Sequence, residues 1–340
     1  MQSILATALV IATTVSTSAF ALSISPTQHS CSAADVSNSK MTTSKLRSVN
    51  QILRRKQSHW VGDGFEVFPV FADKAFTEEL SPFLMFDYAA PKQFPVNNGP
   101  PKGVGQHPHR GFETVTIAFD GEVEHADSVG NRGVIKPGGV QWMTAGRGII
   151  HQEFHSTEFS KRGGIFEMCQ LWVNLPKDQK MTAPKYQGID DKDIPEVDIP
   201  SGAGTVRVIA GSFGGITGPA STFSPVQLWD VKLPKEGAVA DLPFQADHNC
   251  IVFVRRGGVD VLTGKDDDSA DPLGPQDVAL MKRESGDALR LRAAADDTRL
   301  VIMGGKPLNE PIAARGPFVM NTWDELMEAN QDFRSGNFGR

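Results

Sequence analysis

The sequence predicts an all-β protein with two domains, and three observations support this. At 340 residues the chain exceeds the usual size of one domain, which is about 100–200 residues. Apolar residues make up 40% and charged residues 22%, while 33 Gly and 22 Pro provide many turns. Short apolar runs are broken by Gly, Pro, Asn or Asp at intervals typical of sandwiches and barrels.

The first 45 residues are predicted to be a targeting leader. Residues 5–22 are apolar and hydroxylated, and no acidic residue precedes Asp35. The short apolar core and the small residues around Ala19 favour a cleavable signal over a membrane anchor, so we expect no membrane span in the mature protein. The Ser/Thr-rich continuation is similar to a transit peptide.

A signal followed by a transit-like segment resembles the two-part plastid leaders of algae with complex plastids. The leader therefore predicts an organellar or secretory route, with the plastid as one destination. A simple secretory or mitochondrial leader is the alternative. Without a working leader, the protein would remain in the cytoplasm or nucleus.

Two β-rich regions follow the leader. Residues 46–190 are predicted to form the first domain, with strand-length runs such as FEVFPVF and FETVTIAF. Residues 200–320 form the second, with runs such as VQLWDVKL and CIVFVRRGGVDVL. Residues 185–201 are polar, acidic and proline-bearing, which indicates an interdomain linker. Both halves contain a strand, a glycine turn and another strand, which indicates an internal duplication.

Residues 321–340 are predicted to form a C-terminal helix and tail. Asn321 or Thr322 can cap the helix, with Glu325 nearby. Apolar residues then recur at roughly helical spacing, at Trp323, Leu326, Met327 and Phe333. We expect a surface helix that covers a sheet edge or a barrel end.

Charge and cysteine usage exclude several classes of function. A net charge of −6 and no Lys/Arg-dense face argue against direct nucleic-acid binding. The acidic stretch at 265–272 lacks the glycine and terminal glutamate of a calcium loop, so it is predicted to be a solvated hairpin tip. Cys31, Cys169 and Cys250 lie too far apart for a disulfide framework, and the last two are expected to be buried thiols.

Two pairs of side chains indicate a metal site. His107 and His109 are two residues apart in HPHRGFET, and His151 and Glu153 are two apart in GRGIIHQEFH. Residues i and i+2 of a strand point to the same face, so each pair can chelate one ion. Either pair alone occurs often by chance. Both together, each beside a glycine-rich turn, predict one mononuclear centre.

Other polar residues near these pairs are further candidate ligands. His155 shares the face of His151, but three side chains of one strand cannot easily reach one ion, so it is predicted to be structural or to support the ligands. Glu113 stays on the face of His109 by parity and is a reserve ligand. Arg110 could orient Glu153 or a substrate oxygen, with an outward-facing arginine as the alternative. The remaining isolated histidines are expected to be structural or exposed: His59, His125 and His248.

Three imidazoles and one carboxylate disfavour structural zinc, which usually prefers thiolates, and also Mg²⁺ and Ca²⁺, which prefer oxygen ligands. Iron(II) fits this donor set best. It would keep two coordination positions for water, substrate or dioxygen, as in the two-His, one-carboxylate oxygenases. Fe(III), Mn, Ni, Cu and Zn are alternatives.

The flanks of these residues resemble the pirin family of the cupin superfamily. The resemblance is carried by HPHRGFET, GVIKPGGVQWMTAGRGIIHQE, QLWVNLPKDQKMTAPKYQ and EPIAARGPFVMNT, and it extends from about Gly62 to the C-terminus. It implies a bicupin, two stacked cupin barrels with metal only in the first. It also implies that the ligands are His107, His109, His151 and Glu153, with Glu153 rather than Glu113 as the carboxylate.

Pirin relatives imply two classes of function. One is a quercetinase-type dioxygenase that uses dioxygen on a flavonol or a similar hydroxylated aromatic, with Glu153 as the catalytic base for the substrate's enol proton. The other is a metal-sensing regulator without turnover that binds a partner protein, of the transcription coregulator type. A leader argues against a nuclear role. A third class is a scaffold whose ion only stabilises the barrel.

Overall fold

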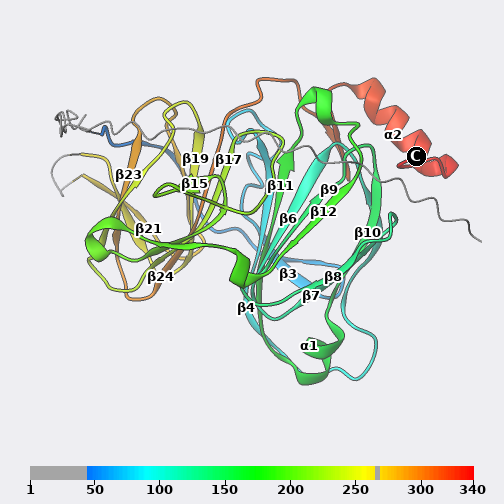
Figure 1. Ribbon diagram of the computed structural model, residues 1–340, viewed down its shortest axis with the longest axis horizontal. Helices are drawn as coiled ribbons and strands as arrows, with labels where there is room; N and C mark the ends of the chain where they lie inside the picture. The colour runs from blue at the N-terminus through cyan, green and yellow to red at the C-terminus, as the bar shows by residue number, and fades with distance from the viewer. Residues whose placement is uncertain (1–43, 265–268) are drawn as a thin grey trace, which may run out of the picture. The chain divides into compact units, whose positions relative to one another are not determined.

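The computed structural model describes residues 44–264 and 269–340, and its regular structure is nearly all β (Figure 1). The predicted leader and the start of the acidic stretch, residues 265–268, therefore lie outside the described residues. The described part contains two α-helices, α1 (Thr157–Arg162) and α2 (Trp323–Ser335). None of its helices is both long and apolar enough to cross a membrane. The predicted all-β class is confirmed.

The first domain consists of two antiparallel sheets. The large sheet has the order β12-β9-β6-β11-β4-β3-β2. Its strands are β2 (His59–Val61), β3 (Phe65–Pro69), β4 (Phe83–Phe94), β6 (Phe112–Asp120), β9 (Val140–Thr144), β11 (Gly164–Asn174) and β12 (Lys185–Ile189). The small sheet has the order β5-β10-β7-β8, with β5 (Gly103–His109), β7 (Val123–Asp127), β8 (Arg132–Ile135) and β10 (Ile149–His155).

The second domain repeats this arrangement. Its large sheet has the order β1-β22-β19-β24-β17-β14-β13. The strands are β1 (Val49–Leu53), β13 (Glu196–Asp198), β14 (Thr205–Ala210), β17 (Val226–Leu233), β19 (Asn249–Arg256), β22 (Val278–Met281) and β24 (Thr298–Gly305). Its small sheet, β18-β23-β20-β21, comprises β18 (Val239–Pro243), β20 (Val259–Leu262), β21 (Ala270–Leu273) and β23 (Ala288–Ala293). The equal topologies agree with the predicted duplication.

Short elements complete the described chain. Two small hairpins are formed by β15 (Ser212–Phe213) with β16 (Ile216–Thr217) and by β25 (Ala313–Arg315) with β26 (Phe318–Met320). Three 3₁₀ turns lie at Lys177–Gln179, Asp191–Asp193 and Pro200–Gly202.

The segments near the domain boundary join the sheets in an unexpected way. Strand β1 comes from the region that the sequence assigned to the first domain, yet it pairs with β22 of the second. The predicted linker at 185–201 is not purely a connection, because β12 pairs with β9 and β13 pairs with β14. Apolar alternation predicts that a segment is a strand, but it does not show which sheet edge the strand joins.

A shared hydrophobic core joins the two large sheets. It contains Phe86 and Tyr88 of β4, Ile251 and Phe253 of β19, and Cys169 of β11, all nearly inaccessible to solvent. The Phe253 ring lies 5.1 Å from that of Phe86 and 5.0 Å from that of Tyr88, both edge to face. Aromatic pairs in this geometry add to the free energy gained by apolar burial. This core holds the two domains together.

The C-terminal helix α2 is confirmed, and its start is a capping box. The Thr322 side chain accepts from the Glu325 amide, and Glu325 reaches back to the cap. Of the four apolar residues predicted to share a face, only Leu326 is buried, since Trp323 is 64% exposed and Met327 62% exposed. The helix lies beside the first domain (Figure 1).

Replacing Phe253 tests the shared core. Because its ring is fully buried between the sheets, Phe253→Ala should lower the free energy of unfolding by about 3–5 kcal/mol, measured by urea unfolding. The control Trp323→Ala removes an exposed ring and should change it by less than about 0.5 kcal/mol. Equal effects of both substitutions would contradict the assignment of this core as the joint between the domains.

Candidate metal centre

The two predicted chelating pairs lie on neighbouring strands of the small sheet. β5 ends with His107 and His109, and β10 carries His151 and Glu153. The antiparallel register places His151 opposite His107, and an irregularity follows between His151 and Glu153. Within each pair the residues are two apart on one strand, so their side chains share a face, as predicted from parity.

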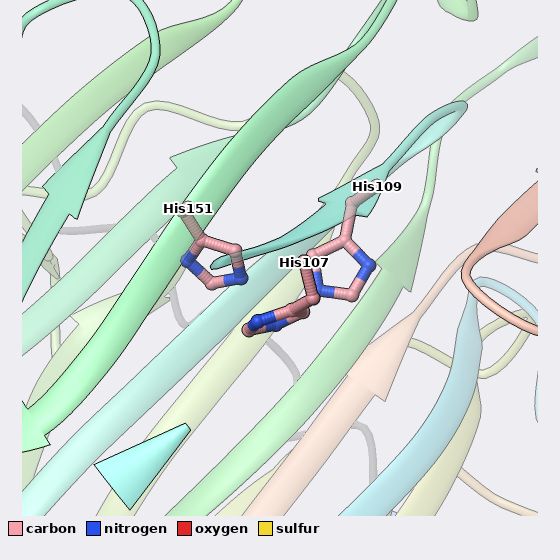
Figure 2. A group of neighbouring side chains, drawn as sticks. All are labelled: His107, His109 and His151. Atoms are coloured by element: carbon pink, nitrogen blue, oxygen red, sulfur yellow. The ribbon is translucent and has the colours of Figure 1, made fainter. Parts of the chain in front are cut away.

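Three imidazoles converge on one point. Figure 2 shows the rings of His107, His109 and His151 turned toward one another. One donor nitrogen from each lies within 4.8 Å of the others, the only such histidine group found among the described residues. The ring centroids are 4.3–4.9 Å apart. This spacing allows three nitrogens to bind one ion.

Each imidazole is held by one nitrogen, which leaves the other for a ligand. His107 Nδ1 lies 2.8 Å from the Gly105 carbonyl, and His151 Nδ1 lies 3.4 Å from His125 Nδ1. A ring nitrogen of His109 donates to the Pro317 carbonyl. The buried His109 Nδ1 and His151 Nε2 have no hydrogen-bond partner in the described chain. Buried polar atoms without partners are costly, so the three residues fit a bound metal ion.

Burial also prepares these imidazoles for coordination. It lowers the pKa of His109 to about 3, with a further contribution from the neighbouring His107. Burial likewise holds the pKa of His151 well below its ordinary value, and the nearby histidines lower it further. Both rings are therefore neutral at physiological pH, and a metal ion does not compete with protons for their nitrogens.

Glu153 lies beside the histidines in a cage of hydrogen-bond donors. Its Oε1 accepts from Gln141 Nε2 at 3.1 Å and from Thr116 Oγ1 at 3.3 Å, and its Oε2 accepts from Gln170 Nε2 at 2.9 Å. Glu153 is not part of the three-histidine group, but it lines the same cavity as His107 and His109. Its role as the fourth ligand remains a prediction.

A cavity of about 300 Å³ opens from these residues into the first barrel. Most of its wall is apolar, and includes Phe65, Val67, Met85, Met168 and Trp172. Its polar side chains are those of Asp87, His107, His109, Glu153 and Gln170. A small site with apolar walls and a few convergent polar groups suits a flat organic ligand.

Asp87 is a second carboxyl group in this cavity. It has no hydrogen bond or ion pair with the described residues, and burial raises its pKa to about 7. An acid with a raised pKa in a cavity that already contains candidate metal ligands is a candidate functional group.

The prediction that Glu113 shares a face with His109 is wrong. Gly111, with φ +88°, makes a turn between β5 and β6, and these strands belong to different sheets. Glu113 instead lies on the face of β6 that carries Val115 into the shared core, and it accepts from Thr144 Oγ1 at 2.8 Å. Parity holds along one strand and is lost at a turn.

Arg110 fits neither predicted role. Its guanidinium is buried, donates to Asp332 of α2 at 2.9 Å and lies over the Phe338 ring. His155 is structural, as one reading proposed: four phenylalanines surround its ring, and its Nε2 lies 3.0 Å from the Gly64 carbonyl. His59 is exposed and His248 is buried in the second domain.

Sequence reasoning missed the role of His125. Its ring contacts His151, stacks on Tyr186 with centroids 4.9 Å apart, and lies 3.1 Å from an oxygen of Asp127. It therefore fixes the ring of His151 from behind. The missed signal was its position in VEHAD, where it shares a face with Asp127 and with the buried Val123.

Gln141 and Gln170, which hold Glu153, were also missed. Each is a single amide side chain in an otherwise apolar strand, VQWMT and MCQLW. A buried amide needs partners, so such a residue in an apolar run indicates a polar network inside the barrel.

Comparison with known proteins identifies the family. The pirin family model matches residues 64–173, and the pirin C-terminal cupin domain matches residues 228–339. The chain belongs to the pirin family. A protein of Pseudomonas aeruginosa, named as a candidate quercetin 2,3-dioxygenase, is 47% identical over 296 residues, which cover 87% of this chain and 99% of that protein. Pirin of Mus musculus is 38% identical over 265 residues, 77% of this chain and 84% of that protein.

A solved structure supports the same assignment. The crystal structure of a quercetin 2,3-dioxygenase from Acinetobacter baumannii is 48% identical in sequence and superposes with a TM-score of 0.81. The match covers 86% of this chain and 99% of the other. The predicted pirin resemblance and bicupin fold are confirmed.

Removing one imidazole should weaken metal binding strongly. We expect His109→Ala and His151→Ala to raise the Kd for Zn²⁺ by on the order of 100-fold or more, since loss of even a supporting residue costs about 10–100-fold. Competition with a chromophoric chelator measures this. His59→Ala replaces an exposed histidine and should leave the Kd unchanged. Equal Kd values for all three variants would contradict a three-histidine centre.

Asp87 should make stability depend on pH. Its pKa is raised from 3.8 to about 7, so between these values the folded protein keeps a proton that the unfolded chain has lost, and stability falls as pH rises. The Tm advantage of Asp87→Asn over wild type should therefore grow from about pH 4 to about pH 7 and then stay constant. Asp198→Asn, on the exposed face of β13, serves as control. A Tm difference between Asp87→Asn and wild type that does not change with pH would refute the raised pKa of Asp87.

Proposed function

We propose that this pirin-family chain is a metal-dependent dioxygenase acting on quercetin-like flavonols or related hydroxylated aromatics. The observation that carries the proposal is a group of three converging imidazoles, two of which line a cavity that also has a hydrogen-bonded carboxylate and an apolar wall. The names of the Pseudomonas and Acinetobacter relatives, which both refer to quercetin 2,3-dioxygenase, support it.

The metal we propose is Fe(II), held by His107, His109, His151 and Glu153. Many non-haem iron oxygenases bind Fe(II) through two histidines and one carboxylate. The donor set proposed here has the same ligands and one additional histidine. Fe(III), Mn, Ni, Cu and Zn fit the same donors. A bound ferrous ion would supply Lewis acidity toward a substrate oxygen and redox chemistry with dioxygen.

Glu153 would act as the base. A hydroxyl group of the substrate that approaches the histidines comes within reach of this carboxylate, which can accept its proton. Gln141, Thr116 and Gln170 fix both carboxylate oxygens, so the base keeps its position while it gains the proton. Loss of that proton makes the substrate ring electron-rich and ready to react with dioxygen.

The apolar wall would bind the aromatic rings and exclude water. Phe65, Met85 and Trp172 present flat or flexible apolar surface to the cavity. The volume of about 300 Å³ is at the lower end of ligand pockets, which favours a planar molecule over a bulky one. Water is kept from the reacting ring, which limits side reactions.

Oxygen consumption tests the proposal. Full-length protein loaded with Fe²⁺ under anaerobic conditions is mixed with oxygenated buffer and quercetin, and dioxygen uptake and loss of quercetin absorbance are recorded. We expect turnover in wild type and in His59→Ala, and none in His107→Ala. Glu153→Gln should lower kcat by about 10²–10⁴-fold, because it removes the base.

Quercetin loss no faster than in His107→Ala, for protein whose iron content is verified, would refute the dioxygenase. Retained iron without turnover would favour the alternative of a metal-sensing protein that binds a partner. Affinity capture with the Fe(II) and Fe(III) forms would then separate that role from a merely stabilising ion, since only a sensor binds different partners in the two forms.

A further inference from the structure

Asp87 occupies a defined position relative to the candidate metal centre. In β4 it alternates with Phe86 and Tyr88, which face the shared core, so its own side chain faces the cavity. In the neighbouring strand β11 its register partner is Gln170, which donates to Glu153. Asp87 therefore lies one strand beyond Gln170 in the large sheet.

Its surroundings leave the carboxyl without a protein partner. The cavity side chains nearest in sequence and register are Met85, Met168 and Gln170, and the described residues provide no cation or hydrogen-bond donor for Asp87. The Asp87 side chain is only half-buried, so a ligand that fills the cavity would remove the remaining water from the carboxyl. A half-buried carboxyl in the wall of a ligand cavity, without a hydrogen-bond partner among the described residues, is available to bind a ligand.

The chemistry of that ligand follows from the wall. Phe65, Val67 and Trp172 favour an aromatic ring, while a carboxyl group accepts a hydrogen bond from a hydroxyl. A planar molecule with one hydroxyl at Glu153 could present a second hydroxyl to Asp87, which lies across from Gln170 on the neighbouring strand.

We propose that Asp87 is a specificity residue that binds a second hydroxyl of the substrate, so that the cavity selects aromatics with at least two hydroxyl groups. This inference rests on the proposed function and specifies its substrate class as polyhydroxylated planar aromatics. When the ligand fills the cavity, the Asp87 carboxyl has a hydrogen-bond partner only if the second hydroxyl is present. Substrates without it leave the group unpaired and bind more weakly.

Binding, separated from turnover, tests the role of Asp87. Full-length protein loaded with Zn²⁺, which has no redox chemistry, is titrated with quercetin and with analogues that each lack one hydroxyl, and quenching of tryptophan fluorescence gives Kd. In wild type, one analogue should bind about 10-fold more weakly than quercetin. In Asp87→Leu, this analogue and quercetin should have equal Kd values. The Kd differences between quercetin and the other analogues should persist.

Two further variants control for structure. Asp87→Asn keeps an oxygen that accepts the same hydrogen bond, so it should retain the preference. Asp198→Asn should behave as wild type. Asp87→Leu removes an unpaired carboxyl from an apolar wall, so its Tm should equal or exceed that of wild type, and its loss of preference cannot then come from unfolding.

The outcomes separate this inference from the proposed function. If Asp87→Leu keeps every hydroxyl preference, or if wild type shows none, the role of Asp87 is refuted even when the iron-loaded protein turns over quercetin. If the preference exists and depends on Asp87 while dioxygen uptake is absent, the dioxygenase is refuted and the hydroxyl site stands. If wild type binds no member of the panel, both are refuted.

Discussion

Both faces of the large sheet in the first domain are buried, and this constrains every residue of its central strands. In β11, Met168, Gln170 and Trp172 face the cavity, whereas Cys169 and Leu171 face the shared core with the second domain. A slip of one residue would exchange the two sets. It would place the amide of Gln170 among aromatic rings and remove a donor from Glu153. The packing of the domains and the geometry of the site therefore fix the same register.

The duplication shows which residues of the second barrel occupy the positions equivalent to the candidate site. Gly121 and Gly257 make equivalent left-handed turns before β7 and β20. His125 and Val261 each lie four residues after their glycine, so they occupy equivalent positions. Their cross-strand partners, Glu153 and Leu291, are therefore also equivalent. His151 with His107 then corresponds to Leu289 with Leu242. All four counterparts belong to the apolar core of the second barrel. One barrel is stabilised by filling its interior, and the other keeps polar groups and a cavity there.

Much of this could be predicted from the sequence, for reasons specific to each residue. The pairs at His107 and His151 were predictable because side chains alternate between the two faces along a single strand. The start of the helix at Thr322 was predictable because a helix cap bonds an amide only a few residues away. Glu113 was misplaced because a single glycine turn moved it to another sheet. The partners of Arg110 could not be predicted, since its contacts come from residues far away in the chain that only the tertiary fold brings together.

Distant contacts of this kind also connect the end of the chain to the two loops that carry the candidate ligands. The Pro317 carbonyl accepts from the ring of His109, and the buried Lys180 ammonium donates to the carbonyls of Gly111 and Val319, 2.8 and 2.9 Å away. Arg147, in the turn before β10, donates to the Gly339 carbonyl. The segment after β24 thus returns from the second domain to both loops that carry the ligand pairs. The chain therefore passes through the second barrel, whose interior is apolar, before its last segment contacts the loops that carry the candidate ligands.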